Sequence, residues 1–83
     1  MKDNYTKSLV EVLLQAENFD EMLDLLKGLL TLGELEEIAR RLQIVRLLKS
    51  GLSQREIAKK LKVGVATVTR GSREIKLGRF TSV

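Results

Sequence analysis

The side chains able to do chemistry in this sequence are mostly cationic and hydroxyl groups gathered between residues 53 and 76. Gln54 and Arg55 stand at the start of one expected helix, and the outward face expected for the next carries Ala66, Thr69, Arg70 and Arg73. The amide, guanidinium and hydroxyl groups among them donate hydrogen bonds to the oxygens of a phosphate, but they do not form a nucleophile–base pair. The pattern therefore favours binding of an anion over catalysis.

Cysteine and histidine are both absent from the 83 residues. Their absence excludes disulfides, thiolate nucleophiles, zinc sites built from these residues and histidine-based acid–base schemes. An enzyme would have to work from Glu, Asp, Lys or Tyr5 alone, and no pair of carboxylates stands beside a Gly-rich or apolar pocket motif. We expect neither an enzyme nor a metal protein.

Charge divides the chain into two contrasting halves. Residues 1–39 contain nine acidic and three basic side chains, residues 40–83 contain twelve basic and two acidic ones, and the net charge is +4. This asymmetry predicts a polyanionic partner for the second half, with a merely solvated basic face as the alternative. No apolar stretch reaches the roughly 20 residues that span a bilayer, and no secretory signal is evident. We expect a cytoplasmic protein without a membrane partner.

Hydrophobic periodicity predicts an all-α chain of five to six helices. The expected helices cover approximately residues 4–17, 19–28, 32–49, 53–61 and 65–76, and a tail at 77–83 is expected to be frayed or loosely packed. Residues 1–83 are predicted to form a single domain, made of residues 1–50, residues 53–76 and the tail. In the third helix the expected apolar stripe is Leu35, Ile38, Ala39, Leu42, Val45 and Leu48.

Helix ends are marked by local signals. Thr31-Leu-Gly-Glu34 and Ser53-Gln-Arg-Glu56 both fit the S/T-x-x-E capping box, in which each side chain bonds the other residue's backbone N–H. Asn18 or Asp20 is expected to cap the second helix, and Gly51 to end the third.

The first two helices carry more apolar surface than they can bury on each other. Their shared feature is a high leucine content, and their apolar residues include Leu9, Val12, Leu13, Ala16, Phe19, Met22, Leu23, Leu25, Leu26, Leu29 and Leu30. A short chain often completes its core by oligomerisation, so we expect a homodimer. The alternative is a deeply packed monomer core.

Residues 53–61 and 65–76, separated by Lys62-Val63-Gly64, match a helix-turn-helix. The inward faces are expected to be Ile57, Ala58 and Leu61 in the first helix and Val65, Val68, Ser72 and Ile75 in the second. Lys62 stands where this turn usually has glycine. Either Lys62 adopts the left-handed conformation, or the turn is shifted and Gly64 does. The second helix is rich in Val and Thr and contains Gly71, so we expect it to be mobile without DNA or ligand.

The segments Ser53-Gln-Arg-Glu-Ile57 and Val65-Ala-Thr-Val-Thr-Arg-Gly-Ser72 closely resemble the tryptophan repressor superfamily. With the preceding helix the resemblance covers residues 31–76. It implies an all-helical, intertwined homodimer with two reading heads in successive major grooves, about 34 Å apart, on a near-palindromic operator.

The resemblance also implies positions that contact DNA. The phosphate-contacting positions of the family correspond to Gln54, Arg55, Gly64, Thr67, Thr69, Arg70 and Lys76. Val65, Ala66 and Thr69 correspond to positions that meet base edges, and Arg73 to a further contact. The partner implied is double-stranded DNA, so we expect residues 1–50 to serve mainly dimerisation and residues 53–76 to read DNA.

A corepressor site is implied by the same resemblance, with L-tryptophan as the family's ligand. Its counterparts here are Thr31, Arg70, Thr67 and either Arg41 or Arg40, while Glu74 replaces a serine. Without a ligand, the arginines would pair with Glu36 and Glu37, and Thr31 would only cap its helix. Tryptophan, another small effector and no effector all remain open.

The function predicted is a sequence-specific, DNA-binding transcriptional regulator, a repressor acting as a homodimer with or without a small-molecule corepressor. The alternative is a helix-turn-helix module for protein–protein interaction, or an accessory subunit, without specific DNA readout.

Overall fold

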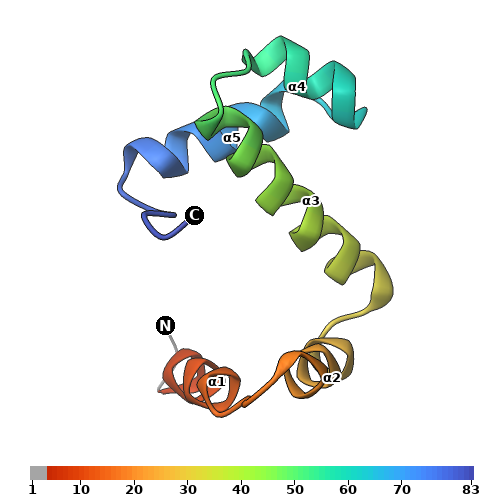
Figure 1. The fold of residues 1–83 in the computed structure, drawn as a ribbon, viewed down its shortest axis with the longest axis vertical. Coiled ribbons are helices and arrows are strands. Elements are labelled where there is room, and N and C mark those ends of the chain that lie inside the picture. The colour runs from red at the N-terminus through yellow and green to blue at the C-terminus, as the bar shows by residue number, and fades with distance from the viewer. Residues whose placement is uncertain (1–3) are drawn as a thin grey trace. The chain divides into compact units, whose positions relative to one another are not determined.

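The computed structural model describes residues 4–83, which form five helices and no strand. The helices are α1 (Tyr5–Leu14), α2 (Phe19–Leu29), α3 (Leu32–Lys49), α4 (Gln54–Leu61) and α5 (Val65–Lys76) (Figure 1). The predicted all-α fold is confirmed, but α1 ends before the predicted Glu17. The backbone N–H groups of Gln15 and Ala16 bond the carbonyls of Val12 and Leu13, a tight i to i−3 turn that closes the helix.

The described residues form two compact units, one reaching to Leu35 and the other comprising Glu36–Val83. Helix α3 contributes its first residues to one unit and the remainder to the other. Among the described residues, no helix is both long enough and apolar enough to cross a bilayer.

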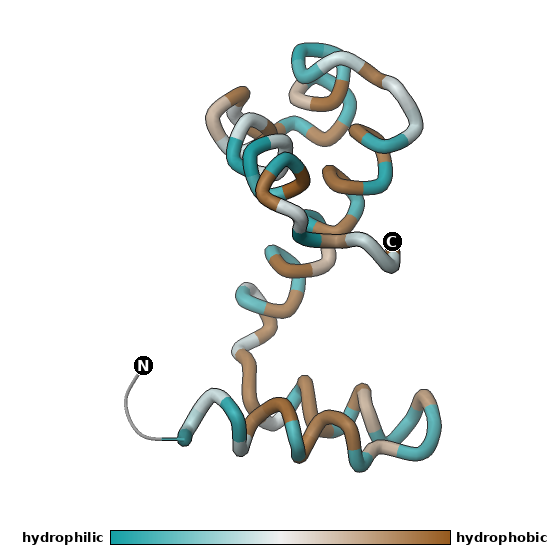
Figure 2. Tube along the Cα trace, turned by 90° about the vertical axis from the view of Figure 1, so that its left-hand side faces the viewer, coloured by the Kyte–Doolittle hydropathy of each residue, from teal (hydrophilic) through white to brown (hydrophobic). Residues whose placement is uncertain are grey.

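The first unit, residues 4–35, exposes many of its apolar side chains and buries the others only in part. Neither α1 nor α2 contains a buried residue, and Leu14 and Phe19 are each 78% exposed. Hydrophobic positions recur along both helices in Figure 2. The apolar surplus predicted from the sequence is therefore present and uncovered in the single chain.

The second unit, Glu36–Val83, has a core of its own. Ile44, Ile57, Ala58 and Val68 are buried together, and the half-buried Leu47, Leu48, Leu52, Leu61 and Val63 pack against them. The predicted inward positions Ile57, Ala58 and Val68 are confirmed. Because Ala58 is small, α5 can approach α4 and seat Val68 on it.

One predicted inward position is wrong. Val65 is 49% exposed, since it opens α5 before the helix reaches the core. In the expected stripe of α3, Ile38 (47%) and Ala39 are exposed in the single chain. Conversely, Ile44 is only 1% exposed, although its burial was not predicted from the sequence. The C-terminal half of α3 packs against more than one element, so its buried face includes two adjacent residues, Ile44 and Val45, which a single stripe does not predict.

The predicted caps are confirmed. Asn18 accepts from the backbone N–H of Glu21 at 2.9 Å, and the Thr31–Glu34 and Ser53–Glu56 capping boxes each show both bonds. In each box, the hydrogen bonds from the backbone N–H and then the hydroxyl of the Thr or Ser lower the pKa of the glutamate.

The end of α3 is a Schellman motif around Gly51, as its sequence position indicated. Gly51 has φ +100°, its N–H bonds the Leu48 carbonyl, and the N–H of Leu52 bonds the Leu47 carbonyl at 3.2 Å.

Candidate nucleic-acid interface

The turn between α4 and α5 uses Lys62 as its left-handed residue. Lys62 has φ 57° and ψ 46°, whereas Gly64 has the extended values φ −70° and ψ 149°. The N–H of Val63 bonds the carbonyl of Ala58 at 3.0 Å and closes the turn. Of the two geometries that the sequence left open, the strained lysine is therefore the correct one, and the turn is not shifted.

The start of α5 lacks a side-chain cap. Asn18 and Ser53 cap α2 and α4 with side-chain oxygens, but Gly64 at the start of α5 has no side chain to do so. Gly64, Val65, Ala66 and Thr67 are all exposed. An uncapped helix start presents backbone N–H groups and the positive end of the helix dipole, both of which suit an anion.

The residues predicted to contact DNA lie on α4, the turn and α5, and all but two are exposed. The exceptions, Gln54 and Thr69, are half-buried, and the Thr69 hydroxyl lies 2.6 Å from the Gln54 Oε1. The same hydroxyl lies 3.0 Å from the Val65 carbonyl. Thr69 thus ties α5 to the start of α4, and its hydroxyl is engaged within the protein.

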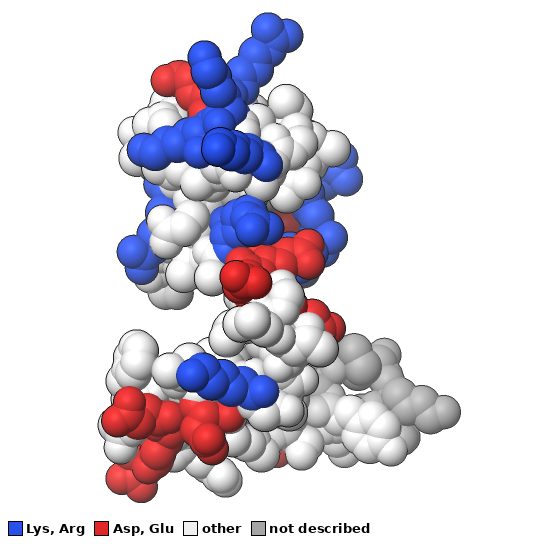
Figure 3. All heavy atoms as spheres, turned by 90° about the vertical axis from the view of Figure 1, so that its right-hand side faces the viewer, with Lys and Arg blue, Asp and Glu red and all other residues white. Residues whose placement is uncertain are grey.

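Positive charge covers this unit. On the visible face of residues 36–83 in Figure 3, Lys and Arg spheres prevail over Asp and Glu spheres, while in residues 4–35 acidic spheres gather together. The exposed cations on α4, the turn and α5 are Arg55, Lys59, Lys60, Lys62, Arg70, Arg73 and Lys76. None of them forms an ion pair within the described residues. Lys59, Lys60 and Lys62 were not among the residues predicted from the sequence to contact DNA, although Lys59 and Lys60 make the last turn of α4 basic.

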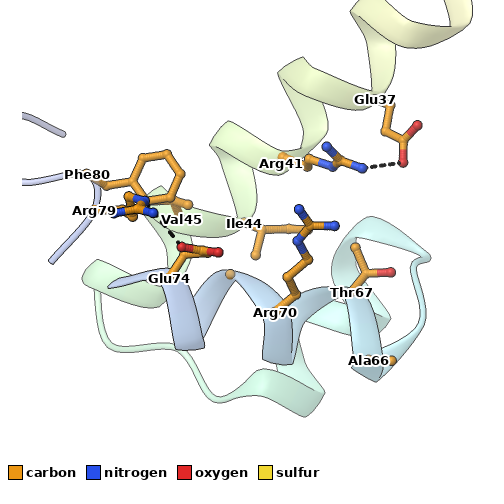
Figure 4. A pocket seen from close by; sticks show the side chains of 11 residues that line it. Glu37, Arg41, Ile44, Val45, Ala66, Thr67, Arg70, Glu74, Arg79 and Phe80 are labelled. Carbon is orange, nitrogen blue, oxygen red and sulfur yellow. Dashed lines mark hydrogen bonds and ion pairs between the residues drawn. The ribbon is translucent and has the colours of Figure 1, made fainter. Parts of the chain in front are cut away.

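A cavity of about 460 Å³ lies beside α5 within the same unit. Of the predicted effector residues, Arg41, Thr67, Arg70 and Glu74 line it (Figure 4). Arg40 is not among its lining residues, and Thr31 belongs to the other unit. Arg41 therefore lines this cavity and Arg40 does not, while effector binding by either arginine stays a prediction.

Two of the three arginines that line the cavity form ion pairs, and the third does not. Arg41 pairs with Glu37 at 3.1 Å, and Arg79 Nε lies 3.5 Å from Glu74 Oε2, an oxygen that is buried without a hydrogen bond. Arg70 has no ion pair in the described range. Arg41, Arg70 and Thr67 supply donors for a carboxylate, and Ile44, Val45 and Ala66 supply an apolar wall. No cluster of three or more potential metal-ligating side chains occurs in residues 4–83.

Residues 77–83 are all exposed, but hydrogen bonds give the tail a defined course. Gly78 (φ +94°) ends α5, the Arg79 N–H bonds the Glu74 carbonyl at 3.0 Å, and the chain turns back. The Lys49 ammonium donates to the carbonyls of Phe80 and Val83. Arg79 and Phe80 thereby join the cavity lining. The tail has no periodicity, so only the helix-stopping Gly78 could have indicated this turn.

Known proteins resemble this chain over most of its length. The family model described as Trp repressor protein matches residues 4–80. A Trp operon repressor homolog of Vibrio vulnificus (strain YJ016) is 56% identical over 54 residues, which are 64% of this chain and 53% of that protein. The matched region thus spans about half the length of that relative. No solved structure gives a significant match.

More distant relatives align over longer stretches. The Trp operon repressor homolog of Vibrio parahaemolyticus serotype O3:K6 (strain RIMD 2210633) is 41% identical over 71 residues, covering 84% of this chain and 69% of the relative. That of Xylella fastidiosa (strain M23) is 35% identical over 69 residues, covering 82% and 75%. Together with the helix-turn-helix and the family match over residues 4–80, these alignments show that the chain belongs to the Trp repressor family.

Proposed function

We propose that this chain is a DNA-binding transcriptional regulator of the repressor type, which acts as a homodimer on a near-palindromic operator. The observation that carries the proposal is the exposed, uncapped start of α5 within a surface of unpaired cations. The helix start and Arg70 contact phosphates, while Val65 and Ala66 face base edges in the major groove. Small Ala66 permits close approach to a thymine methyl.

The uncovered apolar surface of α1 and α2 supports the homodimer. A single chain leaves Leu14, Phe19 and Leu29 more than half exposed, so a second copy gains by covering them. In this arrangement the acidic unit, residues 4–35, dimerises, and the basic unit, residues 36–83, meets DNA, so the unit that meets the phosphates carries the opposite charge.

The cavity is the place where a small-molecule corepressor would bind. Arg41, Arg70 and Thr67 would hold the carboxylate of an amino acid such as L-tryptophan, and Ile44, Val45 and Ala66 would face its side chain. Glu74 would meet the ammonium group only when it is released from Arg79.

In vitro selection of bound DNA from a random pool, with and without tryptophan, tests this function. We expect enrichment of two half-sites one helical turn apart, about 34 Å. Neutralising six to eight phosphates should give a log–log salt slope of about −5 to −7.

Variants distinguish the proposed phosphate contacts from the proposed base contacts. Arg70→Ala should weaken binding to all sequences, Ala66→Leu should mainly change the preferred base, and Lys27→Ala in α2 serves as the control. Salt-independent binding, or no retention on heparin and random DNA, would overturn the proposal in favour of a protein–protein module.

A further inference from the structure

The two exposed sides of α4 differ in charge. Arg55 and Lys59 stand four residues apart, so they occupy the same side of the helix, and Lys62 follows in the turn. Glu56 and Lys60 share the other side by the same spacing. We call Arg55, Lys59 and Lys62 the α4 stripe; all three are exposed, and none has an ion pair with another described residue. The stripe is therefore purely cationic, whereas the other side is mixed.

Two features of the α4 stripe do not serve the fold. Like charges at positions i and i+4, as in Arg55 and Lys59, repel each other on a helix. The left-handed backbone of Lys62 (φ 57°, ψ 46°) is unfavourable for a residue with a Cβ, and such outliers concentrate at functional sites. Lys59 does suit the negative end of the helix dipole, but Lys60 does so equally and lies off the stripe. A polyanion that neutralises the stripe accounts for both features.

Contacts at the two ends of α4 hold the stripe beside the start of α5. At one end, the Gln54 Oε1 accepts from the Thr69 hydroxyl at 2.6 Å. At the other end, Lys62 lies in the short turn that leads to Val65, where α5 begins. When the second helix of a helix-turn-helix enters the major groove, the first helix crosses the sugar–phosphate backbone. This placement favours a DNA strand over other polyanions as the partner of the stripe.

We propose that the α4 stripe binds phosphates of any DNA duplex and supplies sequence-independent affinity, while α5 selects the sequence. This inference rests on the proposed function and adds the surface that holds DNA irrespective of its sequence. From Arg55 to Lys62 a helix rises about 10 Å, a length over which one DNA strand presents about three phosphates. Each cation of the stripe can therefore contact a different phosphate.

The test measures binding of the full chain to two duplexes over a series of salt concentrations. One duplex has a random sequence, and the other is enriched by the chain itself from a random pool. The stripe variant combines Lys59→Gln with Lys62→Gln, which removes two charges at exposed positions. The matched control combines Lys27→Gln with Lys60→Gln, which removes two charges from the last turns of α2 and α4.

The stripe variant should bind both duplexes about tenfold to a hundredfold more weakly at about 0.1 M salt, and its log–log salt slope should be about two units shallower. The ratio of the two affinities should stay within about twofold of the wild-type ratio, because phosphates carry no sequence information. The control should change the slope by less than about one unit. Lys62→Arg keeps the charge and should bind both duplexes as the wild type does.

A control that weakens binding as much as the stripe variant would show that net charge, rather than the stripe, holds DNA. A wild-type slope in a stripe variant with unchanged circular dichroism would also overturn the inference and leave the proposed function intact. Loss of the preference for the enriched duplex in the stripe variant would contradict the division between α4 and α5. If no sequence is enriched, but the stripe variant still binds random duplex more weakly than the control, operator recognition fails and the stripe stands.

Discussion

The two units of the chain obtain their order in opposite ways. Residues 36–83 bury Ile44, Ile57 and Val68 to 1% exposure or less, whereas residues 4–35 contain no buried residue in either full helix. The basic unit carries its own core, and the acidic unit exposes the surface from which a core could be made with another chain. The contrast teaches that α1 and α2 pack only partly within one chain, whereas the second unit completes its core alone.

The largest effect is expected in the core of the basic unit. Ile57→Ala removes a fully buried side chain that touches α3 and α5, so the free energy of unfolding should fall by about 2–5 kcal/mol. Denaturant unfolding followed by circular dichroism measures it. The exposed neighbour Lys59→Ala should change stability little. Equal effects of the two variants would contradict the core described here.

A charge at Phe19 should then break the acidic unit's association. In one chain Phe19 is 78% exposed, so Phe19→Glu should leave the monomer fold unchanged, but across a dimer interface it should weaken association at least about tenfold. Sedimentation velocity over a concentration series measures the change. Leu77→Glu, at a 64% exposed position in the other unit, is the control. A monomeric wild-type chain would remove the dimer from the proposal.

Glycine-to-alanine exchanges should have opposite signs in the two units. A Cβ at Gly71 would lie 3.1 Å from Ile44 Cγ2 and 3.5 Å from Leu48 Cδ1, while at Gly28 nothing lies within 4 Å. Both changes gain up to about 1 kcal/mol in helix propensity, but crowding against the packed Ile44 costs about 1–3 kcal/mol. Gly71→Ala should therefore destabilise by about 1 kcal/mol.

Gly28→Ala is the matched exchange and should stabilise the chain. Thermal unfolding of both variants measures the difference. A destabilised Gly28→Ala would show that α2 is closely covered in the assembled protein.

The smallest effect concerns pH and should be alike in both units. The hydrogen bonds from Thr31 and Ser53 lower the pKa of Glu34 and Glu56. These bonds therefore stabilise the fold fully above the ordinary glutamate pKa of about 4.3, and the contribution disappears as pH falls through the lowered pKa of the folded state. Carboxyl carbon shifts in an NMR titration should show both midpoints below the ordinary value.

Glu56→Gln is the control for the pH effect, since glutamine keeps the capping bond and removes the titration. If its unfolding free energy falls between pH 6 and pH 3 as steeply as that of the wild type, Glu56 does not contribute to the pH dependence.

The helix ends were predictable because each depends on a few adjacent residues. Both capping boxes, Asn18 and Gly51 are local signals, and their bonds are present in the structure. The buried Ile44 was not predictable from one stripe, because its burial depends on how α4 and α5 pack against α3. The mobility of α5 without DNA stays a prediction.

The full set of DNA contacts was implied by the family resemblance and stays a prediction. The exposure of Ala66, Arg70 and Arg73 was predictable, since outward positions follow from helical spacing. The engagement of Thr69 with Gln54 was not, because it joins residues on two helices. The cavity end made by Arg79 and Phe80 depends on a turned-back tail whose anchor, Lys49, is distant in sequence.

The left-handed Lys62 couples two properties that most proteins can adjust separately. Glycine and asparagine are the residues that accept this backbone most easily, and both are neutral. Any exchange that relaxes the turn therefore removes one positive charge from the basic surface. Protein engineering at this position would gain thermal tolerance and lose electrostatic attraction in the same step.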